Sequence, residues 1–551
     1  MQRKRVACVP RKGAGDAPRL LQRSMRPLPI IILLSLLLCS LASCLSDEDV
    51  STSPDDRLYF SADSVAFDTI VSGMPTGTVR LTAYNPTDKT IALPSVYLEG
   101  GAGSAFKVNV DGTPLAEGSA TDFEVMGKDS IMIYLFANTP QLDTDEPVRH
   151  EDRLVFQTGG GAVQKVKLTA TGQSVINLPS TPITEDRTLD AARPYRIKDS
   201  LVVAEGATLT LPAGARLYFH GEARLIVYGT LLVLGTLDKP VVMRGDRFEN
   251  MFEGQPYDRV PGQWGGVTLK AQSYGNYINY LDLHSSKTGL TLEAGDLTRE
   301  KLVMENSILH NATNNCLTAT MANIYVGNCQ ITNAGGNCVE LHGGDNTFAH
   351  CTIARFYPFT GGYGVALDFS NYLGEQRTPL ERLDFINCIV TGNKDDDIMG
   401  NHSAYTEDAF EYRFFNCLLN TPPYADERLM DCLWDGDGRT SADRAAGFEP
   451  AFDDAQLIYK FNLSPTSRAL NKANAELSAL TYPEDRLGKN RLADEAPDMG
   501  CYERQAGTDR SLSGESTRRK SKDFQTRGLS DKASRKAHTG QAVLIVFVSS
   551  G

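Results

Sequence analysis

The sequence lacks the features that would place it among helical or membrane-spanning proteins. Its longest apolar run, residues 28–41, has about fourteen residues, whereas a helix needs roughly twenty to cross a bilayer. Between residues 303 and 419, apolar positions do not recur with the helical period of 3.6, and Gly, Asn and Asp interrupt the segments every few residues. We therefore expect neither a membrane-spanning helix nor an α-helical solenoid.

Cysteine is present, but not in the patterns of metal sites. The chain has 11 cysteines, yet no Cys-x-x-Cys motif and no Cys/His pair has the spacing of zinc ligands. We therefore expect no metal site and no cofactor. No cysteine lies between residues 58 and 175, so a domain there depends on its apolar core alone. Most of the others occupy the repeated phrases described below, where we favour buried free thiols over disulfides.

Positive charge is scarce in the body of the chain. The formal net charge is −13, but residues 1–43 and 504–551 are basic, which leaves about −26 on residues 44–503. An acidic body repels phosphates, so nucleic acid is not an expected partner. The charge suits a solvated protein at a cell surface.

One short phrase returns at nearly even distances between residues 303 and 419. It consists of a polar residue, then Cys or Ser, then two residues that are mostly aliphatic: Asn306-Ser307-Ile308-Leu309, Asn328-Cys329-Gln330-Ile331, His350-Cys351-Thr352-Ile353, Asn387-Cys388-Ile389-Val390 and Asn416-Cys417-Leu418-Leu419. The first two steps are 22 residues and the later ones are longer, so a module of about 22 residues recurs with insertions. A second phrase follows about ten residues later, which predicts two short strands per module.

Modules this small cannot each bury an apolar face alone, so we expect them to stack along an axis as a parallel β-helix. Equivalent positions then form columns, with small Cys or Ser inside and the Asn side chains capping the turns. Short strands that end at Gly between residues 201 and 243 extend the pattern backwards and resemble the first coils of right-handed parallel β-helix proteins. We assign residues 200–447 to this domain, with about ten coils.

Longer alternating strands precede the solenoid. Runs such as 79–84, 130–135 and 166–170, separated by turn residues, predict an antiparallel β-sandwich over residues 58–177. Phe67-Asp68-Thr69, Tyr84-Asn85-Pro86 and Gly172-Gln173 resemble the immunoglobulin-like modules that precede other domains in bacterial surface lipoproteins. That resemblance implies a spacer, and residues 178–199 are expected to be a linker. The fold class is therefore all-β.

The start of the chain resembles that of a Bacteroidota-type surface lipoprotein. Basic residues precede the apolar run in the leader and signal peptide, 1–43, which ends in Leu41-Ala42-Ser43 before Cys44. This resembles a lipobox and implies lipid attachment at Cys44. Ser46, Asp47, Glu48 and Asp49, in an acidic linker over 44–57, resemble the signal that exports such proteins to the outer face of the outer membrane. Met25 is an alternative start.

The end of the chain divides into two parts. Residues 448–503 resemble the closing segment of β-helix lipoproteins, an irregular C-terminal cap that covers the last coil, as an open solenoid end requires. Residues 504–551 turn to Ser, Arg and Lys without periodicity and are expected to be a disordered basic tail.

Acidic residues raise the hypothesis of a polysaccharide lyase or glycoside hydrolase of the parallel β-helix type. The best cluster is Asp395-Asp396-Asp397, of which at most Asp395 and Asp397 would converge if the segment were a strand. A solvated corner is the favoured interpretation, and Asp435-Gly436-Asp437-Gly438 only partly resembles a calcium loop. Signature motifs of pectate lyases and polygalacturonases are lacking, so no catalytic residue is assigned.

A binding or structural role has more support in the sequence. Aromatic residues concentrate in two inserts that interrupt the repeat, and they include Tyr257, Trp264, Tyr357 and Tyr363. On a rigid rod, such rings could stack on sugars, although packing of the inserts onto the solenoid is the favoured interpretation of the rings themselves. We expect an envelope-anchored lipoprotein whose rod presents a surface for glycans or another envelope component, with the polysaccharide-degrading enzyme as the alternative.

Overall fold

The structure is a computed structural model that describes residues 49–252, 255–359, 362–405, 407–449, 452 and 460–505. Cys44, Ser46, Asp47 and Glu48 lie outside the described residues, as do the leader 1–43 and nearly all of the basic tail 504–551. Within the described part, helix is confined to two short α-helices, α2 (Ser441–Ala445) and α3 (Ala475–Thr481), and two 3₁₀ turns, η1 (Gly101–Gly103) and η2 (Tyr257–Arg259). None of these helices is long and apolar enough to span a membrane.

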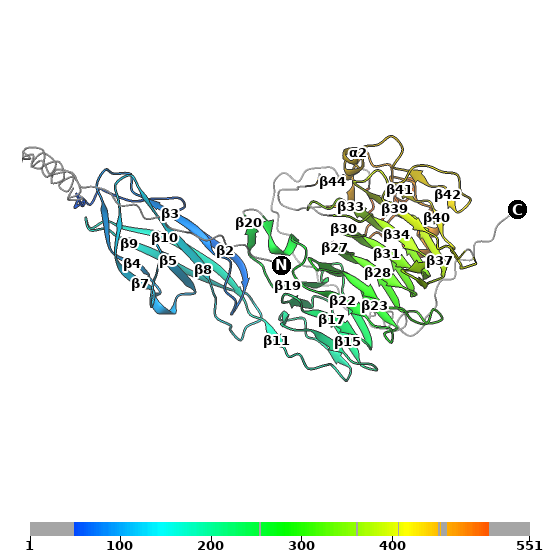
Figure 1. The fold of residues 1–551 in the computed structure, drawn as a ribbon, viewed down its shortest axis with the longest axis horizontal. Coiled ribbons are helices and arrows are strands. Elements are labelled where there is room, and N and C mark those ends of the chain that lie inside the picture. Colours follow the sequence, from blue (N-terminus) through cyan, green and yellow to red (C-terminus); the bar gives the residue numbers. More distant parts are fainter. Residues whose placement is uncertain are drawn as a thin grey trace, which may run out of the picture. The chain divides into compact units, whose positions relative to one another are not determined.

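The N-terminal region is the expected β-sandwich (Figure 1, blue to cyan). One five-stranded sheet contains β1 (Tyr59–Phe60), β3 (Val79–Tyr84), β8 (Ser130–Ala137), β5 (Phe106–Val110) and β6 (Thr113–Pro114). The other contains β2 (Ser64–Val71), β10 (Val163–Gln173), β9 (Val148–Gln157), β4 (Ile91–Leu98) and β7 (Ser119–Val125). Pairing is antiparallel except between β2 and β10, which run parallel. Alternate residues of each strand fill one apolar core, as the sequence pattern predicts.

Residues 176–434 wind into a parallel β-helix with three long sheets (Figure 1, green to yellow). The 11-stranded sheet contains β11 (Ile176–Leu178), β13 (Tyr195–Ile197), β16 (Arg216–Phe219), β19 (Val241–Gly245), β24 (Leu281–His284), β27 (Ile308–Ala312), β30 (Gln330–Ala334), β33 (Thr352–Arg355), β38 (Ile389–Gly392), β41 (Leu418–Leu419) and β43 (Leu433–Trp434). The 10-stranded sheet contains β12 (Arg187–Thr188), β15 (Thr208–Pro212), β18 (Thr230–Leu234), β23 (Asn276–Asn279), β26 (Leu302–Glu305), β29 (Asn323–Gly327), β32 (Gly344–Ala349), β37 (Leu380–Ile386), β40 (Arg413–Phe415) and β42 (Leu429–Met430). The 8-stranded sheet contains β14 (Leu201–Val203), β17 (Arg224–Val227), β22 (Gly266–Leu269), β25 (Leu290–Leu292), β28 (Leu317–Thr320), β31 (Val339–His342), β34 (Leu367–Ser370) and β39 (Ile398–Asn401).

Each full coil gives one strand to each sheet, so a module holds three strands rather than the two expected from the phrases. In the coil after residue 301, the chain runs through β26, β27 and β28 in turn. The strand of each module that was not predicted from the sequence precedes the Asn phrase. The expected linker, 178–199, contains β12 and β13, which pair with β15 and β16 and therefore form part of the first coil. Two-stranded ribbons complete the list: β20 (Asn250–Phe252) with β21 (Gln255–Pro256), β35 (Tyr372–Leu373) with β36 (Gln376–Arg377), and β44 (Phe448–Glu449) with β45 (Asn462–Leu463).

The repeated Asn phrase forms the corner between the 10-stranded and 11-stranded sheets, which we call the repeat corner. Its members Asn306, Asn328, His350, Asn387 and Asn416 all adopt left-handed backbone conformations, with φ between 49° and 55°. Asn tolerates this region better than most residues. The amide of Asn328 donates to Oδ1 of Asn306 at 2.7 Å, so the side chains link successive coils as expected.

The cysteine of each phrase points into the core. The backbone N–H groups of Cys351 and Cys388 donate to the sulfur atoms of Cys388 and Cys417 in the next coil, at 3.3 and 3.4 Å. All eight cysteines in the described part of the chain are unpaired, and seven are buried. The expectation of buried free thiols is confirmed. Burial raises the pKa of the seven buried thiols, as for Cys501, where it reaches about 12.

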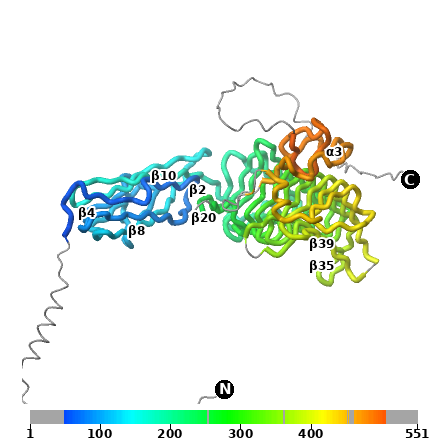
Figure 2. Tube along the Cα trace, turned by 90° about the horizontal axis from the view of Figure 1, so that it is seen from above, coloured from blue at the N-terminus to red at the C-terminus, as the bar shows by residue number. Residues whose placement is uncertain are grey.

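The described part of the C-terminal segment 448–503 lies over the repeat corner of several coils, rather than over the last coil only. Tyr482 donates from its hydroxyl to Glu305 at 2.9 Å, and the N–H of Gly500 donates to the carbonyl oxygen of Asn387 at 2.8 Å. Figure 2 shows the segment around α3 against the side of the stacked coils. The segment therefore shields a flank of several coils in addition to its apolar contacts with the later ones.

Arg491 anchors this segment. Its guanidinium is fully buried and donates to Oδ1 of Asn328 at 2.8 Å and to the carbonyl oxygen of Gly500 at 2.9 Å. Glu503 lies 3.3 Å away. Burial lowers the pKa of Arg491 and raises the pKa of Glu503 to about 8, so the loss of water around this pair outweighs the mutual attraction. The hydrogen bonds to Asn328 and Gly500 are therefore needed to hold the arginine.

Candidate functional site

Most candidate residues from the sequence lie along the edge between the 11-stranded and 8-stranded sheets, which we call the insert edge. Two long connections occur there, 246–265 between β19 and β22 and 356–366 between β33 and β34. Three short connections separate them, and the connection 393–397 follows in the next coil. The coil repeat thus brings Tyr257, Trp264, Tyr357 and Tyr363 to one edge, together with the three aspartates. Among the export-signal residues, only Asp49 is described; it is exposed and lies 3.7 Å from the Lys89 amine.

Trp264 is not part of a ligand surface, contrary to the expectation from the sequence. Its side chain is 0% exposed, and its ring stacks on Phe219 with a centroid distance of 4.3 Å. The indole N–H donates to the carbonyl oxygen of His284 at 2.8 Å. The ring therefore fills the core at the end of the first insert, and its polar atom is satisfied inside the protein.

The three tyrosines divide between packing and exposure. Tyr257 and Tyr357 are half-buried, and Tyr357 packs on Phe359 with a centroid distance of 5.3 Å. Tyr363 is 67% exposed, while its backbone is held by hydrogen bonds to Gly335 at 2.8 Å and from the Lys394 amine at 2.8 Å. The inserts therefore use most of their rings for packing, and Tyr363 alone of the four presents most of its surface to solvent.

The aspartates of the 395–397 segment do not converge. Asp395 and Asp396 are exposed, as a solvated corner predicts, whereas Asp397 is 0% exposed. Asp397 accepts hydrogen bonds from the Lys394 N–H at 3.0 Å and from the Asn420 amide at 2.8 Å, and its other oxygen has no partner among the described residues. Burial raises the pKa of Asp397 to about 6. The carboxyl group is enclosed and does not join Asp395 at a surface site.

The partial calcium motif also has a structural explanation. Asp435 is buried and accepts a hydrogen bond from the Thr391 hydroxyl at 3.0 Å. The Arg439 guanidinium lies 2.9 Å from its other oxygen. Both carboxylate oxygens therefore have partners within the protein, which leaves no free oxygen pair at this residue for calcium.

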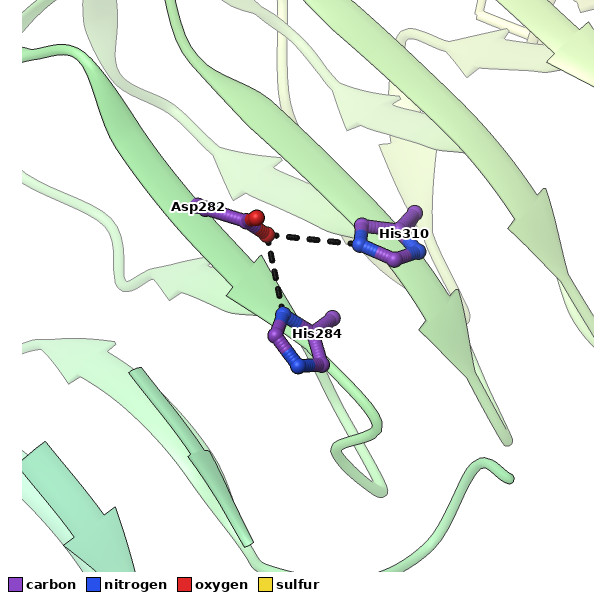
Figure 3. Close-up of side chains that lie close together, drawn as sticks. All are labelled: Asp282, His284 and His310. Atoms are coloured by element: carbon purple, nitrogen blue, oxygen red, sulfur yellow. Dashed lines mark hydrogen bonds and ion pairs between the residues drawn. The ribbon is translucent and has the colours of Figure 1, made fainter. Parts of the chain in front are cut away.

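A compact acid–imidazole cluster lies on the outer face of the 11-stranded sheet (Figure 3). Asp282 and His284 come from β24, and His310 comes from β27 in the next coil. Oδ1 of Asp282 lies 2.9 Å from Nδ1 of His284 and 3.3 Å from Nε2 of His310. The two imidazole rings stack with a centroid distance of 4.9 Å. These donor types and separations could hold a metal ion, since the three ligand atoms lie within 4.8 Å of one another.

This cluster was not predicted from the sequence, because it contains no Cys/His pair at the short spacing of zinc ligands. The available signal was Asp282-x-His284, which places both side chains on one face of a strand, with His310 directly after a repeat phrase one coil later. Burial lowers the pKa of His284, which favours a neutral imidazole. Burial alone would raise the pKa of Asp282, but the imidazoles outweigh it and keep that pKa well below its usual range.

A cavity of about 360 Å³ opens near the C-terminal end of the rod, and we call it the end pocket. It occurs where the 8-stranded sheet stops at β39, while the other two sheets continue through β40 to β43. Its lining combines aromatic rings with some polar groups: Phe369, Asp396, Ile398, Gly400, Phe410, Tyr412, Phe414, Leu419, Thr421, Pro422, Pro423, Tyr424, Leu429 and Trp434. Tyr424 is half exposed at its rim, and Trp434 packs near it with a ring-centroid distance of 5.8 Å.

The end pocket was also missed, because Tyr424 lies in a connection without a repeated pattern. Tyr424 and Trp434 lie beyond the last long module, where strands shorten to two residues. Trp434 ends Asp431-Cys432-Leu433-Trp434, a further variant of the repeat phrase in which Asp431 has a φ of 53° and Trp434 pairs with Leu419. This variant of the phrase was the available signal.

Comparisons with known proteins agree with the β-helix. Residues 181–298 match a family model described as a pectate-lyase like beta helix domain. No curated protein matches the sequence. Similar solved structures include a family 28 exopolygalacturonase from Yersinia enterocolitica, with 11% identity, 69% of this chain and 84% of that chain covered, and a TM-score of 0.22. A GH87 α-1,3-glucanase from Streptomyces thermodiastaticus has 12% identity, covers 69% of this chain and 96% of its own, and has a TM-score of 0.25. At such low scores, these likenesses support no inference about activity.

Proposed function

We propose that this protein is a cell-envelope lipoprotein that binds glycan chains in the end pocket of its β-helix. The observation that carries the proposal is the combination of Tyr412, Tyr424 and Trp434 with polar groups around one opening. Sugar rings present apolar C–H faces that stack on aromatic rings, and hydroxyls that bond to carboxylates and hydroxyls. The proposal moves the glycan site from the inserts to the end of the rod.

The polar groups at the pocket favour a glycan over a wholly apolar ligand. Asp396 is exposed and contributes a carboxylate, and Thr421 contributes a hydroxyl. The Tyr412 hydroxyl donates to Asp426 at 3.1 Å, and the Arg428 guanidinium lies 4.0 Å from the Tyr412 ring centroid. These contacts fix the Tyr412 ring before any ligand arrives, which reduces the entropy that binding would cost.

A pocket of this size supports a short stretch of a chain rather than a long one. Its volume of about 360 Å³ is near the lower end of the range for ligand sites, roughly 300–1,000 Å³. We therefore infer recognition of one or two sugar units, with the rest of a polymer extending into solvent. Weak binding at each site is the expected regime, and several copies on one membrane would strengthen it by multivalency.

The anchor is the second part of the proposal and rests on the sequence alone. Cys44 follows Leu41-Ala42-Ser43 at the end of an apolar run, and Ser46, Asp47, Glu48 and Asp49 follow it. A lipid on Cys44 would hold the protein at the outer membrane, with the acidic linker leading to the outer face. The β-sandwich would then be a spacer between the membrane and the rod.

Glycan binding can be tested by affinity electrophoresis against a panel of neutral and acidic polysaccharides. We expect retardation by at least one polysaccharide, and a loss of retardation in the Tyr424→Ala, Trp434→Ala double variant. The matched control is Tyr363→Ala, which removes an exposed ring from the insert edge. Loss of binding in the control but not in the double variant would return the site to the inserts, and lack of binding to all polysaccharides would contradict the proposal.

The same panel separates binding from degradation, which is the alternative function. Release of reducing or unsaturated sugar ends would identify a hydrolase or a lyase. The anchor is tested independently by incorporation of labelled palmitate in a bacterial host. We expect labelling of the wild type and none of Cys44→Ala, and equal labelling of both would contradict lipid attachment at this residue.

A further inference from the structure

The cluster of Asp282, His284 and His310 is fixed by the geometry of the β-helix. His284 and His310 are register partners on adjacent parallel strands, so their side chains project from the same face, one coil apart. Asp282 precedes His284 by two residues and therefore projects from that face as well. The indole of Trp264 binds the carbonyl oxygen of His284 from the other side of the chain. The three side chains in Figure 3 thus start from a backbone that cannot easily move.

The separations between their donor atoms match those around a metal ion. In a tetrahedral site with bonds of about 2.0–2.2 Å, neighbouring ligand atoms lie about 3.3 Å apart. Oδ1 of Asp282 lies 2.9 Å from Nδ1 of His284 and 3.3 Å from Nε2 of His310. The two nitrogen atoms lie within 4.8 Å of each other, so an ion bound by all three atoms requires only local shifts of the two imidazole rings.

The surroundings leave one side of the cluster open. The side chains of Asp282 and His310 are 31% and 26% exposed, whereas that of His284 is 9% exposed. Solvent can therefore reach the cluster from the side of Asp282 and His310. Such access allows an ion to enter, and it leaves room for water in the remaining coordination positions.

The nearest fixed cation is already paired. Arg244 occupies the equivalent position one coil before His284 on the same face. Its guanidinium lies 3.2 Å from the Asp258 carboxylate and donates to the carbonyl oxygen of Gly245 at 3.1 Å. Asp258 offsets the positive charge of Arg244, and Asp282 contributes one negative charge to the cluster. The positive charge of Arg244 beside the cluster is therefore paired with a carboxylate.

We propose that Asp282, His284 and His310 form a mononuclear site for a divalent transition-metal ion such as Zn²⁺, with the remaining coordination positions taken by water. Two imidazoles and one carboxylate suit zinc and its neighbours rather than calcium or magnesium, which prefer oxygen ligands. The site shares no residue with the end pocket, so a test of metal binding does not depend on glycan binding. It departs from the expectation, drawn from the sequence, that the chain has no metal site.

The test uses the chain without a histidine tag, freed of metal by dialysis against a chelator. Zn²⁺ binding is measured by calorimetry, and Co²⁺ is used as a spectroscopic probe whose visible bands report nitrogen and oxygen ligation in a site of low coordination number. We expect one ion per chain in the wild type. Loss of a second-shell partner of a metal site typically lowers affinity by about 10–100-fold, so removal of a ligand in His310→Ala or Asp282→Asn should lower it by more than about 100-fold.

The matched control is His220→Ala. His220 also forms a histidine–aspartate pair, with Nδ1 3.0 Å from Asp246, but the described residues contain no third metal ligand beside it. We expect this variant to bind Zn²⁺ and Co²⁺ as the wild type does. Circular dichroism of each apo-variant checks folding, and His310→Ala is the safer variant because His310 is partly exposed.

Two results would overturn the proposal. One is a wild-type protein that takes up no stoichiometric Zn²⁺ at micromolar concentration and shows no Co²⁺ bands. The other is equal affinity in the wild type, His310→Ala and Asp282→Asn, which would assign any uptake to other side chains. In either case, the cluster is a hydrogen-bonded aspartate–histidine network that joins two coils.

Discussion

The two edges of the 11-stranded sheet differ in regularity. At the repeat corner, successive coils turn through the Asn-Cys phrase or a close variant of it, each with one left-handed residue, and the C-terminal segment contacts this column. At the insert edge, connections range from three residues, as in 198–200, to twenty in 246–265. The first edge maintains the stacking of coils, whereas the second is free to vary in length and composition.

This difference separates structural from functional candidates. Buried polar groups at the repeat corner bond to one another, as Asn387 does to the N–H of Asn474 at 2.8 Å. The exposed ring of Tyr363 belongs to the insert edge, and the Asp396 carboxylate lies both on that edge and in the lining of the end pocket. Substitutions at the repeat corner should therefore affect stability, and those on the exposed side should affect binding.

The largest expected effect is that of Arg491→Ala. This change leaves Asn328 and the Gly500 carbonyl without a buried donor, next to Glu503, whose pKa of about 8 keeps it largely protonated at neutral pH. Each buried acceptor left unsatisfied costs about 1–3 kcal/mol, so the two together cost about 2–6 kcal/mol. We expect a loss of that size in the free energy of unfolding of the β-helix, measured by urea denaturation.

The control for this change is Arg299→Ala, which removes an arginine that lies over the Tyr274 ring with a distance of 3.8 Å to the centroid. Exposed cation–π contacts contribute about 0.5–1 kcal/mol, so a small loss is expected. Equal losses in both variants would mean that the repeat corner does not depend on the C-terminal segment.

The next effect depends on pH and concerns Asp397, at the insert edge but fully buried. Its pKa is raised from 3.8 to about 6 in the folded protein. Well below pH 3.8, the group is protonated in both states and does not affect the free energy of unfolding. As the pH rises from about 4 to 6, the unfolded chain releases the proton first, so the free energy of unfolding falls by up to about 3 kcal/mol.

Asp397→Asn should remove this pH dependence. The stability of the variant relative to the wild type should therefore increase between pH 4 and pH 7, as measured by denaturation at each pH. Asp395→Asn, at an exposed neighbour, should stay within about 0.5 kcal/mol of the wild type throughout. A relative stability of Asp397→Asn that is constant over this range would contradict the assigned burial.

A smaller loss is expected when the left-handed corner is disturbed. Asn328 has a φ of 55° and links Asn306 to Arg491 through its amide. Asn328→Ala should cost about 2–3 kcal/mol, from backbone strain of about 1–2 kcal/mol and lost hydrogen bonds. Asn328→Gly keeps the backbone relaxed, so it should recover about 1 kcal/mol of that loss in the same denaturation experiment. Equal losses in the two variants would show that the amide contacts alone matter.

The same comparison explains what the sequence could predict. Equivalents of Asn328 and Cys329 recur along the sequence. Their spacing therefore predicted the stacked columns, the parallel strand pairing and the buried thiols. The strand before each phrase was missed because its composition, as in Asn323–Gly327, does not recur. The β-sandwich was predicted from alternation in strands such as β8.

The candidate sites were less predictable because they depend on contacts between distant residues. Trp264 is buried because Phe219, 45 positions earlier in the chain, lies beneath its ring. Asp397 and Asp395 differ in burial because the Asn420 amide reaches only one of them. His284 and His310 are 26 residues apart in the sequence and pair on adjacent strands. This spacing brings them together only in the observed strand register, which the sequence alone did not reveal.

The smallest expected effect is that of Tyr363→Ala, which tests whether the insert edge is free of structural constraint. The ring is 67% exposed, and the hydrogen bonds of this residue use backbone atoms that the variant retains. Surface substitutions of this kind usually change stability by less than about 0.5 kcal/mol. Thermal denaturation should therefore barely separate the variant from the wild type. A loss above 1 kcal/mol would mean that the inserts support the coils, and that the two edges differ in sequence regularity but not in role.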